Sequence, residues 1–160
     1  MEEQVILVDE FDNEFGVGNK LEVHRLGLLH RAFSVFIFNS AGELLLQQRA
    51  FDKYHSGGKW TNTCCSHPRP FEETLQAAER RLEEEMGMAS DLTYGFNFLY
   101  KKSLENELIE HEYDHVYFGV SDQLPIINEK EVIAFKYMSL KDLALDLTLN
   151  PTIYTEWLKI

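Results

Sequence analysis

The chain has 160 residues and a formal net charge of −12, from 27 acidic and 15 basic side chains. This length is typical of one domain, so we expect a single domain over residues 1–160. Hydrophobic residues make up 44% of the sequence, which excludes a disordered acidic chain. The acidity argues against a nucleic-acid partner and an anionic membrane surface. Taken alone, it also disfavours an anionic substrate.

The two cysteines, Cys64 and Cys65, are adjacent in the sequence. A bond between neighbours strains the disulfide geometry, so we expect no disulfide framework. Reduced thiols are typical of the cytoplasm, which we expect as the location. The start of the chain lacks the pattern of a signal peptide, and no apolar stretch approaches the length of a membrane span.

The first half of the chain predicts three strands and the turns between them. A short apolar run predicts a strand over residues 5–8, and the polar, glycine-containing segment 11–32 predicts mostly loop. Aromatic and β-branched residues predict a buried strand over 32–39, a turn over 40–43 and a returning strand over 44–48. The next two segments predict a loop and an irregular stretch, over 50–59 and 60–68.

The clearest helix is predicted over residues 72–87, where apolar residues recur at helical spacing and Gly87 ends the pattern. Three further strands are predicted, over 94–101, 110–120 and 132–138. Ser139 caps a predicted helix from Leu140, and Asn150-Pro151 opens a last one that ends near Ile160. Strands and helices mix without strict alternation, so we expect an α/β (α+β) fold, a mixed sheet flanked by helices.

The segment WTNTCCSHP over residues 60–68 places Cys65 two residues before His67. Such a pair can bind a metal ion or form a thiol tuned by a nearby cation. The alternative is a small buried cysteine beside a surface histidine. Neighbours on an extended chain point in opposite directions, so Cys64 fits that alternative better than Cys65.

Glu110 and Glu112 lie at the start of a predicted strand, and alternation places both on one face. The same face continues in Val116, Phe118 and Val120, which predicts that it is buried. Carboxylates on a buried face need a cation or a proton. The alternative is a frayed strand end at which both acids reach water.

His24 and His30 precede the first core strand. A lone histidine in a loop is usually solvated. Together with His67 and the two carboxylates, however, they supply three nitrogen and two oxygen ligands. Such a set suits Mn²⁺, or Zn²⁺ outside its usual tetrahedral geometry.

The predicted helix over 72–87 carries six glutamates and two arginines. Two pairs of opposite charge at i,i+4 favour a solvated face: Arg80–Glu84 and Arg81–Glu85. Glu79 and Glu83, however, are like charges at the same spacing and destabilise the helix unless a cation binds nearby. A divalent ion held by carboxylates and by the phosphates of a substrate is one explanation.

These segments together resemble a known family. The segments that carry the resemblance are WTNTCCSHP, LEVHRLGLLHRAFSVFIFN, RRLEEEMG and IEHE. The resemblance extends from about Val5 to Trp157. The chain resembles type I isopentenyl-diphosphate isomerases of the Nudix fold superfamily. The resemblance implies a Nudix-type α/β/α sandwich. It also implies the reversible isomerisation of isopentenyl diphosphate to dimethylallyl diphosphate in isoprenoid biosynthesis.

The resemblance also implies residue roles. Cys65 matches the catalytic thiol and Glu112 the catalytic acid opposite it, while Tyr100 matches a tyrosine near the carboxylate and Trp157 an aromatic facing the reacting carbons. Glu85 matches the residue that holds Mg²⁺ with the diphosphate. The ligands of a further Mn²⁺ or Zn²⁺ ion are matched by His24, His30, His67, Glu110 and Glu112. The cations around the diphosphate are matched by Lys20, Arg49, Lys53 and Arg81.

The chain departs from the Nudix hydrolase pattern at two positions. Ser66 stands where that pattern opens with Gly, and Arg81 stands where it has Glu. The missing acid weakens the multi-metal site that a hydrolase needs, which favours the isomerase. Phe71 also stands where the family often has Gly, in the turn before the helix.

Two alternatives stay open: a Nudix pyrophosphohydrolase acting on a nucleoside diphosphate derivative, and a metal-binding or regulatory module. The expected partner is a small isoprenoid diphosphate, and no assembly motif argues against a monomer. Part of the acidity then serves to hold divalent cations, so an anionic substrate carried with Mg²⁺ is no longer disfavoured.

Overall fold

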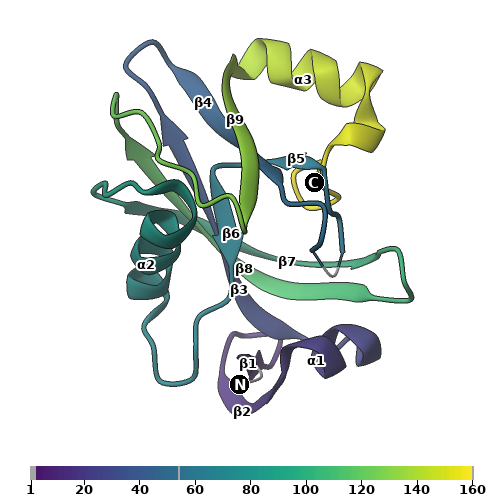
Figure 1. The fold of residues 1–160 in the computed structure, drawn as a ribbon. Coiled ribbons are helices and arrows are strands. Elements are labelled where there is room, and N and C mark those ends of the chain that lie inside the picture. The colour runs from purple at the N-terminus through teal and green to yellow at the C-terminus, as the bar shows by residue number, and fades with distance from the viewer. Residues whose placement is uncertain (1–2, 54, 160) are drawn as a thin grey trace.

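The fold is given by a computed structural model that describes residues 3–53 and 55–159 (Figure 1). The described strands are β1 (Gln4–Val8), β2 (Glu14–Asn19), β3 (His30–Phe38), β4 (Glu43–Arg49), β5 (Trp60–Thr61), β6 (Cys64–Ser66), β7 (Thr93–Ser103), β8 (Ile109–Val120) and β9 (Val132–Ser139). The described helices are α1 (Lys20–Leu26), α2 (Thr74–Met86) and α3 (Leu140–Leu149), and a 3-10 turn follows at Pro151–Ile153. None of these helices is long and apolar enough to cross a membrane.

The strand β3 is the centre of the sheet. It pairs in parallel with β8 over its whole length, and it pairs antiparallel with β1, β4 and β6. Farther out, β7 joins β8 and β9 joins β4. The single parallel ladder within an otherwise antiparallel arrangement makes this a mixed sheet, as predicted.

The two faces of the sheet carry two separate apolar clusters. On one face, β3 residues such as Phe33 and Val35 pack with Leu82 and Met86 of α2. On the other face, Leu44 and Leu46 of β4 pack with helix α3 and with the segment after it. The helices α2 and α3 lie on opposite sides of the sheet (Figure 1), which confirms the predicted helix–sheet–helix arrangement.

The predicted loop over residues 11–32 is wrong. It contains strand β2, helix α1 and the start of β3. Helix α1 is capped by Asn19, whose side chain accepts from the backbone N–H of Glu22, and it ends at Gly27 in the left-handed region. Gly18 allows a close approach, since a Cβ there would lie 2.6 Å from the Val23 side chain. These glycines therefore serve packing and helix termination rather than loop flexibility.

Two further predictions need correction. The irregular stretch over 60–68 contains β5 and β6, which are too short to show a pattern and depend on pairing with β4 and β3. The predicted last helix is limited to the 3-10 turn, because the chain then pairs with Trp60 in a short bridge at Tyr154, where the Thr155 N–H donates to the Trp60 carbonyl. Ile160, where that helix was expected to end, lies outside the described residues.

Candidate active site

Strand register brings distant side chains to one face of the sheet. On β3, His30 and Ser34 lie an even number of residues apart and so point to the same face. Cys65 on β6 is the ladder partner of Ser34, and Glu112 on β8 is the partner of His30. Tyr100 on β7 pairs in turn with Glu112. Partners in a ladder share a face, so these side chains meet although β6 and β8 lie on either side of β3.

Backbone carbonyls fix the rings of His24 and His30. Nδ1 of His24 donates to the carbonyl oxygen of Lys20 at 2.7 Å, and Nδ1 of His30 donates to that of Leu28 at 3.0 Å. A carbonyl oxygen only accepts, so Nδ1 carries the hydrogen in each ring. In the neutral ring the lone pair then lies on Nε2, an arrangement typical of metal-binding histidines.

These lone pairs point at carboxylate oxygens. Nε2 of His24 lies 2.6 Å from Oε1 of Glu110, and Nε2 of His30 lies 3.3 Å from Oε2 of Glu112. Nε2 of His67 lies 2.8 Å from the same oxygen of Glu112. Two acceptors repel at such distances unless a proton or a cation lies between them. The buried Nε2 of His30 has no hydrogen-bond partner among the described residues, which fits a role as a metal ligand.

Two groups of side chains could each hold a metal ion, and they share His24. The first is His24, His30, His67 and Glu112, and the second is His24, His55 and Glu110. Within each group the potential ligand atoms all lie within 4.8 Å of one another. Burial, reinforced by the nearby ring of His30, lowers the pKa of His67 well below its usual value. This ring therefore stays neutral, which is the form that binds metals. These side chains can hold a metal ion.

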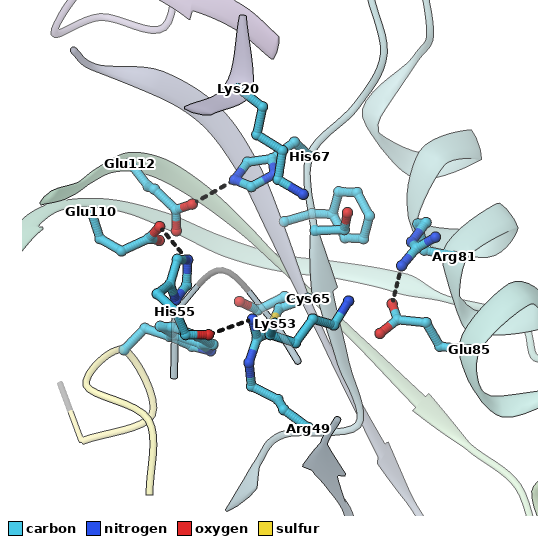
Figure 2. Close-up of a pocket in the computed structure, with 14 residues that line it drawn as sticks. Lys20, Arg49, Lys53, His55, Cys65, His67, Arg81, Glu85, Glu110 and Glu112 are labelled. Carbon is cyan, nitrogen blue, oxygen red and sulfur yellow. Dashed lines mark hydrogen bonds and ion pairs between the residues drawn. The ribbon is translucent and has the colours of Figure 1, made fainter. Parts of the chain in front are cut away.

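His55, which no sequence pattern selects, lies in the predicted loop over 50–59. Its Nε2 lies 3.3 Å from Oε1 of Glu110, and its ring meets that of Trp157 edge-on with centroids 5.7 Å apart. A lone histidine in a polar, glycine-rich loop gives no periodic signal. Only tertiary folding places it beside the cluster (Figure 2).

Asp114 was also missed, although a signal was present. The alternation that selects Glu110 and Glu112 selects Asp114 next, and all three carboxyl groups are buried. Oδ2 of Asp114 accepts from the Ser34 hydroxyl at 2.8 Å. Farther along, the predicted buried face ends early, because Phe118 is only half-buried and Val120, still paired with Phe38, is 70% exposed.

The carboxyl groups of Glu110 and Glu112 titrate in opposite directions. Burial and the negative charge of Glu110 raise the pKa of Glu112. Burial also acts to raise the pKa of Glu110, but the close imidazole rings of His24 and His55 outweigh it and hold that pKa well below the usual range. The Tyr100 hydroxyl donates to Glu112 and lies 3.2 Å from Oε2 of Glu110. Of the two carboxyl groups in this corner, Glu112 therefore takes up a proton more readily than Glu110.

The Cys65 side chain faces the cavity while Cys64 is buried in the core below α2, as the alternation predicted. Burial raises the pKa of the Cys65 thiol strongly, against the opposing charge of Arg49, so the thiol stays protonated. The guanidinium of Arg49 lies 5.2 Å from the ring centroid of Trp157. A protonated thiol, a cation and an indole ring thus line one end of the cavity.

Helix α2 contributes Glu85 and Arg81 to the opposite side of the cavity (Figure 2). Nη2 of Arg81 lies 3.4 Å from Oε2 of Glu85, and Arg80 pairs with Glu84 at 2.9 Å, so both predicted i,i+4 pairs are present. The interpretation of Glu79 and Glu83 as neighbours of a bound cation is wrong. Both are exposed and do not line the cavity, because they lie on the solvent side of α2.

Two carboxylates, Glu3 and Glu131, hold three of the cationic side chains that face the cavity. Lys20 pairs with Glu3 at 3.0 Å, and Lys53 pairs with Glu131. Arg81 lies 3.5 Å from the same Glu131. Glu3 and Glu131 come from distant segments and were not among the predicted site residues. These contacts keep the three cations together at the edge of the cavity.

The structure gathers all the predicted site residues. Ten line one cavity of about 50 Å³, which leaves little room beyond a few waters: Lys20, Arg49, Lys53, Cys65, His67, Arg81, Glu85, Glu110, Glu112 and Trp157. The remaining three, His24, His30 and Tyr100, are buried directly behind Glu110 and Glu112. The cavity is the one drawn in Figure 2.

Known structures share this fold. Residues 28–158 match the NUDIX domain family. A crystal structure of DR0079 from Deinococcus radiodurans superposes with a TM-score of 0.75 at 18% identity, covering 92% of this chain and 90% of that one. A MutT protein from Methanosarcina mazei gives a TM-score of 0.66 at 19% identity, covering 82% and 88%.

Sequence relatives are far more similar. Isopentenyl-diphosphate Delta-isomerase 1 of Aromatoleum aromaticum is 55% identical over 99% of this chain and 90% of its own length. Isopentenyl-diphosphate Delta-isomerase of Pectobacterium atrosepticum is 54% identical over 98% of this chain and 88% of its own length. The chain therefore belongs to the isopentenyl-diphosphate Delta-isomerases, within the NUDIX domain family.

Proposed function

We propose that the chain interconverts isopentenyl diphosphate and dimethylallyl diphosphate in isoprenoid biosynthesis. One observation carries this proposal: Cys65 and Glu112 face one buried cavity from strands on either side of β3. The names of relatives about half identical to the chain support the same reaction. We further propose that the enzyme acts as a monomer in the cytoplasm.

The reaction moves a double bond by adding a proton at one carbon and removing one from another. Neither the alkene nor the allylic C–H bond is activated, so an acid and a base must lie on opposite sides of the flat hydrocarbon. Cys65 and Glu112 are proposed for these two roles. Burial raises the pKa of both groups, so either can carry the proton. The protonated group donates to one carbon, and the deprotonated group on the opposite face removes a proton from the other carbon.

The tertiary carbocation expected on this path needs a dry environment with diffuse negative charge. The Trp157 ring is proposed to face the reacting carbons, where a desolvated cation–π contact contributes about 2 kcal/mol. Trp157 is buried, and it closes the cavity together with His55. Exclusion of water prevents capture of the cation. Tyr100 is proposed to hold Glu112 in place by donating to its carboxylate.

Two divalent ions are proposed for the site. Mn²⁺ or Zn²⁺ fits the set His24, His30, His67, Glu110 and Glu112, and its charge would fix Glu112 and tune its acidity. Mg²⁺ would bind Glu85 together with the substrate diphosphate. Lys20, Arg49, Lys53 and Arg81 would neutralise the remaining phosphate charge. In this way the diphosphate positions the hydrocarbon end between the thiol and the carboxyl group.

Proton NMR in heavy water tests the proposal directly. Isopentenyl diphosphate is incubated with the enzyme and Mg²⁺, and the vinyl signals are followed. We expect conversion to dimethylallyl diphosphate with deuterium incorporated from solvent. Unchanged substrate in the presence of metal-loaded enzyme would refute the function.

A pyrophosphohydrolase is the alternative that the NUDIX fold itself suggests. It predicts release of nucleoside monophosphate from nucleoside diphosphate derivatives. A panel of such compounds, assayed beside isopentenyl diphosphate, separates the two activities. Metal binding without turnover of either substrate would instead indicate a regulatory module.

A further inference from the structure

A second cavity, of about 400 Å³, lies beside the reaction pocket between strands β7 and β8 and helix α3. We call it the α3-side cavity. Its walls are mostly apolar and include Phe96, Phe98, Val116, Leu143 and Leu147. The volume falls in the range of small-molecule sites. The proposed isomerisation makes no use of this cavity.

Two side chains, Ser34 and Trp157, line both the α3-side cavity and the reaction pocket. They are therefore the wall between the two. The indole Nε1 of Trp157 is buried and has no hydrogen-bond partner among the described residues, so no such bond holds the ring in place. The ring is held by its contacts with Arg49 and His55, and a rotation of this side chain would open the part of the wall that it forms.

The orientation of the proposed substrate points at this wall. The diphosphate partners Arg81 and Glu85 lie on one side of the reaction pocket, and the C-terminal segment lies on the other, beyond His55 and Glu110 (Figure 2). With the diphosphate beside α2, the hydrocarbon end is directed toward Trp157. A longer hydrocarbon chain would continue past Trp157 into apolar surroundings.

We infer that the α3-side cavity takes the hydrocarbon tail of prenyl diphosphates longer than five carbons, whose head group occupies the diphosphate site. The inference rests on the proposed function. Such compounds arise from the chain-elongating condensations that consume dimethylallyl diphosphate. They would compete with the substrate, because one diphosphate site serves both. Burial of each added methylene strengthens binding.

Inhibition kinetics test this with two probes that share a head group. Geranyl diphosphate carries ten carbons, and isopentyl diphosphate is a saturated five-carbon analogue that cannot isomerise. We expect both to compete with isopentenyl diphosphate, with the inhibition constant of geranyl diphosphate lower by at least about tenfold. Equal constants, or weaker inhibition by geranyl diphosphate, would overturn the inference.

Variants on helix α3 locate the tail. Leu147 lines the α3-side cavity, whereas Leu145 on the same helix is 59% exposed and does not. Leu147→Trp should raise the inhibition constant of geranyl diphosphate about tenfold and leave that of isopentyl diphosphate unchanged. Leu145→Trp, the matched control, should change neither. An effect of Leu145→Trp equal to that of Leu147→Trp would place the tail elsewhere.

A second variant keeps the test decisive if Leu147→Trp misfolds. Phe96 lies at the rim and is 51% exposed, so Phe96→Asp is tolerated structurally and places a charge beside the tail. Phe96→Asp should weaken the inhibition by geranyl diphosphate and leave that by isopentyl diphosphate unchanged. If the wild-type enzyme does not isomerise isopentenyl diphosphate, the proposed function fails. If it does so without discriminating between the two probes, only the tail site fails.

Discussion

Nε2 of His30 lies 3.3 Å from Oε2 of Glu112, and the two residues are partners in the parallel ladder between β3 and β8. The ladder therefore delivers a nitrogen and an oxygen ligand to the same point from strands far apart in the sequence. His67 reaches the same oxygen from the segment after β6. A cation held here would tie three parts of the sheet together.

Removing one ligand should therefore affect both metal content and stability. His30→Ala is expected to lose the bound metal, which elemental analysis after desalting measures. A ligand that binds only the folded state raises Tm, so a chelator should lower the Tm of wild type but not that of the variant. His111→Ala is the control, since His111 lies on the other face of β8 and bonds the carbonyl of Gly27. Full metal content in His30→Ala would contradict the assignment.

The buried Cys64 thiol donates to Oε2 of Glu85 at 3.0 Å. Burial raises the pKa of this thiol well above its usual value, so it remains a donor. Cys64→Val removes the donor at similar volume and should raise the Mg²⁺ concentration for half-maximal activity about tenfold, the equivalent of about 1.4 kcal/mol. Cys64→Ser keeps a donor and should stay near wild type. Identical Mg²⁺ dependence in Cys64→Val would show that the thiol does not position Glu85.

Phe71 adopts φ +69° in the turn before α2, and its side chain is fully exposed. A left-handed conformation is unfavourable for phenylalanine and costs glycine little. Phe71→Gly should raise the free energy of unfolding by about 0.5–1 kcal/mol in urea denaturation. Phe71→Ala keeps the backbone strain and should change the free energy of unfolding much less. A destabilised Phe71→Gly would mean that the exposed ring makes a contribution of its own.

Arg80 binds Glu72 with two hydrogen bonds, of 2.7 and 3.0 Å, at the start of α2. These bonds lower the pKa of the Glu72 carboxyl group, so its contribution to stability is present above the unfolded-state pKa and is lost as pH falls through the folded-state value. Glu72→Gln should cost about 0.5 kcal/mol near pH 7. Denaturation of both proteins across the acidic range should show this difference shrinking below about pH 4. A difference independent of pH would exclude the ion pair as its source.

Local signals predicted much of the fold. The helix over 72–87 was predicted from apolar spacing and from Gly87, whose N–H does bond the carbonyl of Glu83 in a left-handed cap. Helix α1 carries caps of the same kind, Asn19 and Gly27, but its seven residues are too few for a periodic pattern. Short strands such as β6 exist only through long-range pairing, which a local pattern does not contain.

The site residues also divide into those that a local sequence pattern predicts and those that only the folded chain brings together. Alternation on one strand placed Glu110 and Glu112 together, and the same alternation includes Asp114, which the continuation through Val116, Phe118 and Val120 passed over. His55, Glu3 and Glu131 enter the site from segments whose local sequence gives no reason to select them. Their positions follow from how the sheet and loops assemble.

Deuterium incorporation into isopentenyl diphosphate by Cys65→Ala tests the central claim most directly. The variant is compared with wild type at equal metal content, with Cys64→Ser as the control for a change at the neighbouring thiol. If Cys65 transfers a proton, turnover and deuterium uptake should fall at least about a hundredfold in Cys65→Ala while Tm and metal content are retained. Turnover by Cys65→Ala within a few-fold of wild type would contradict the account.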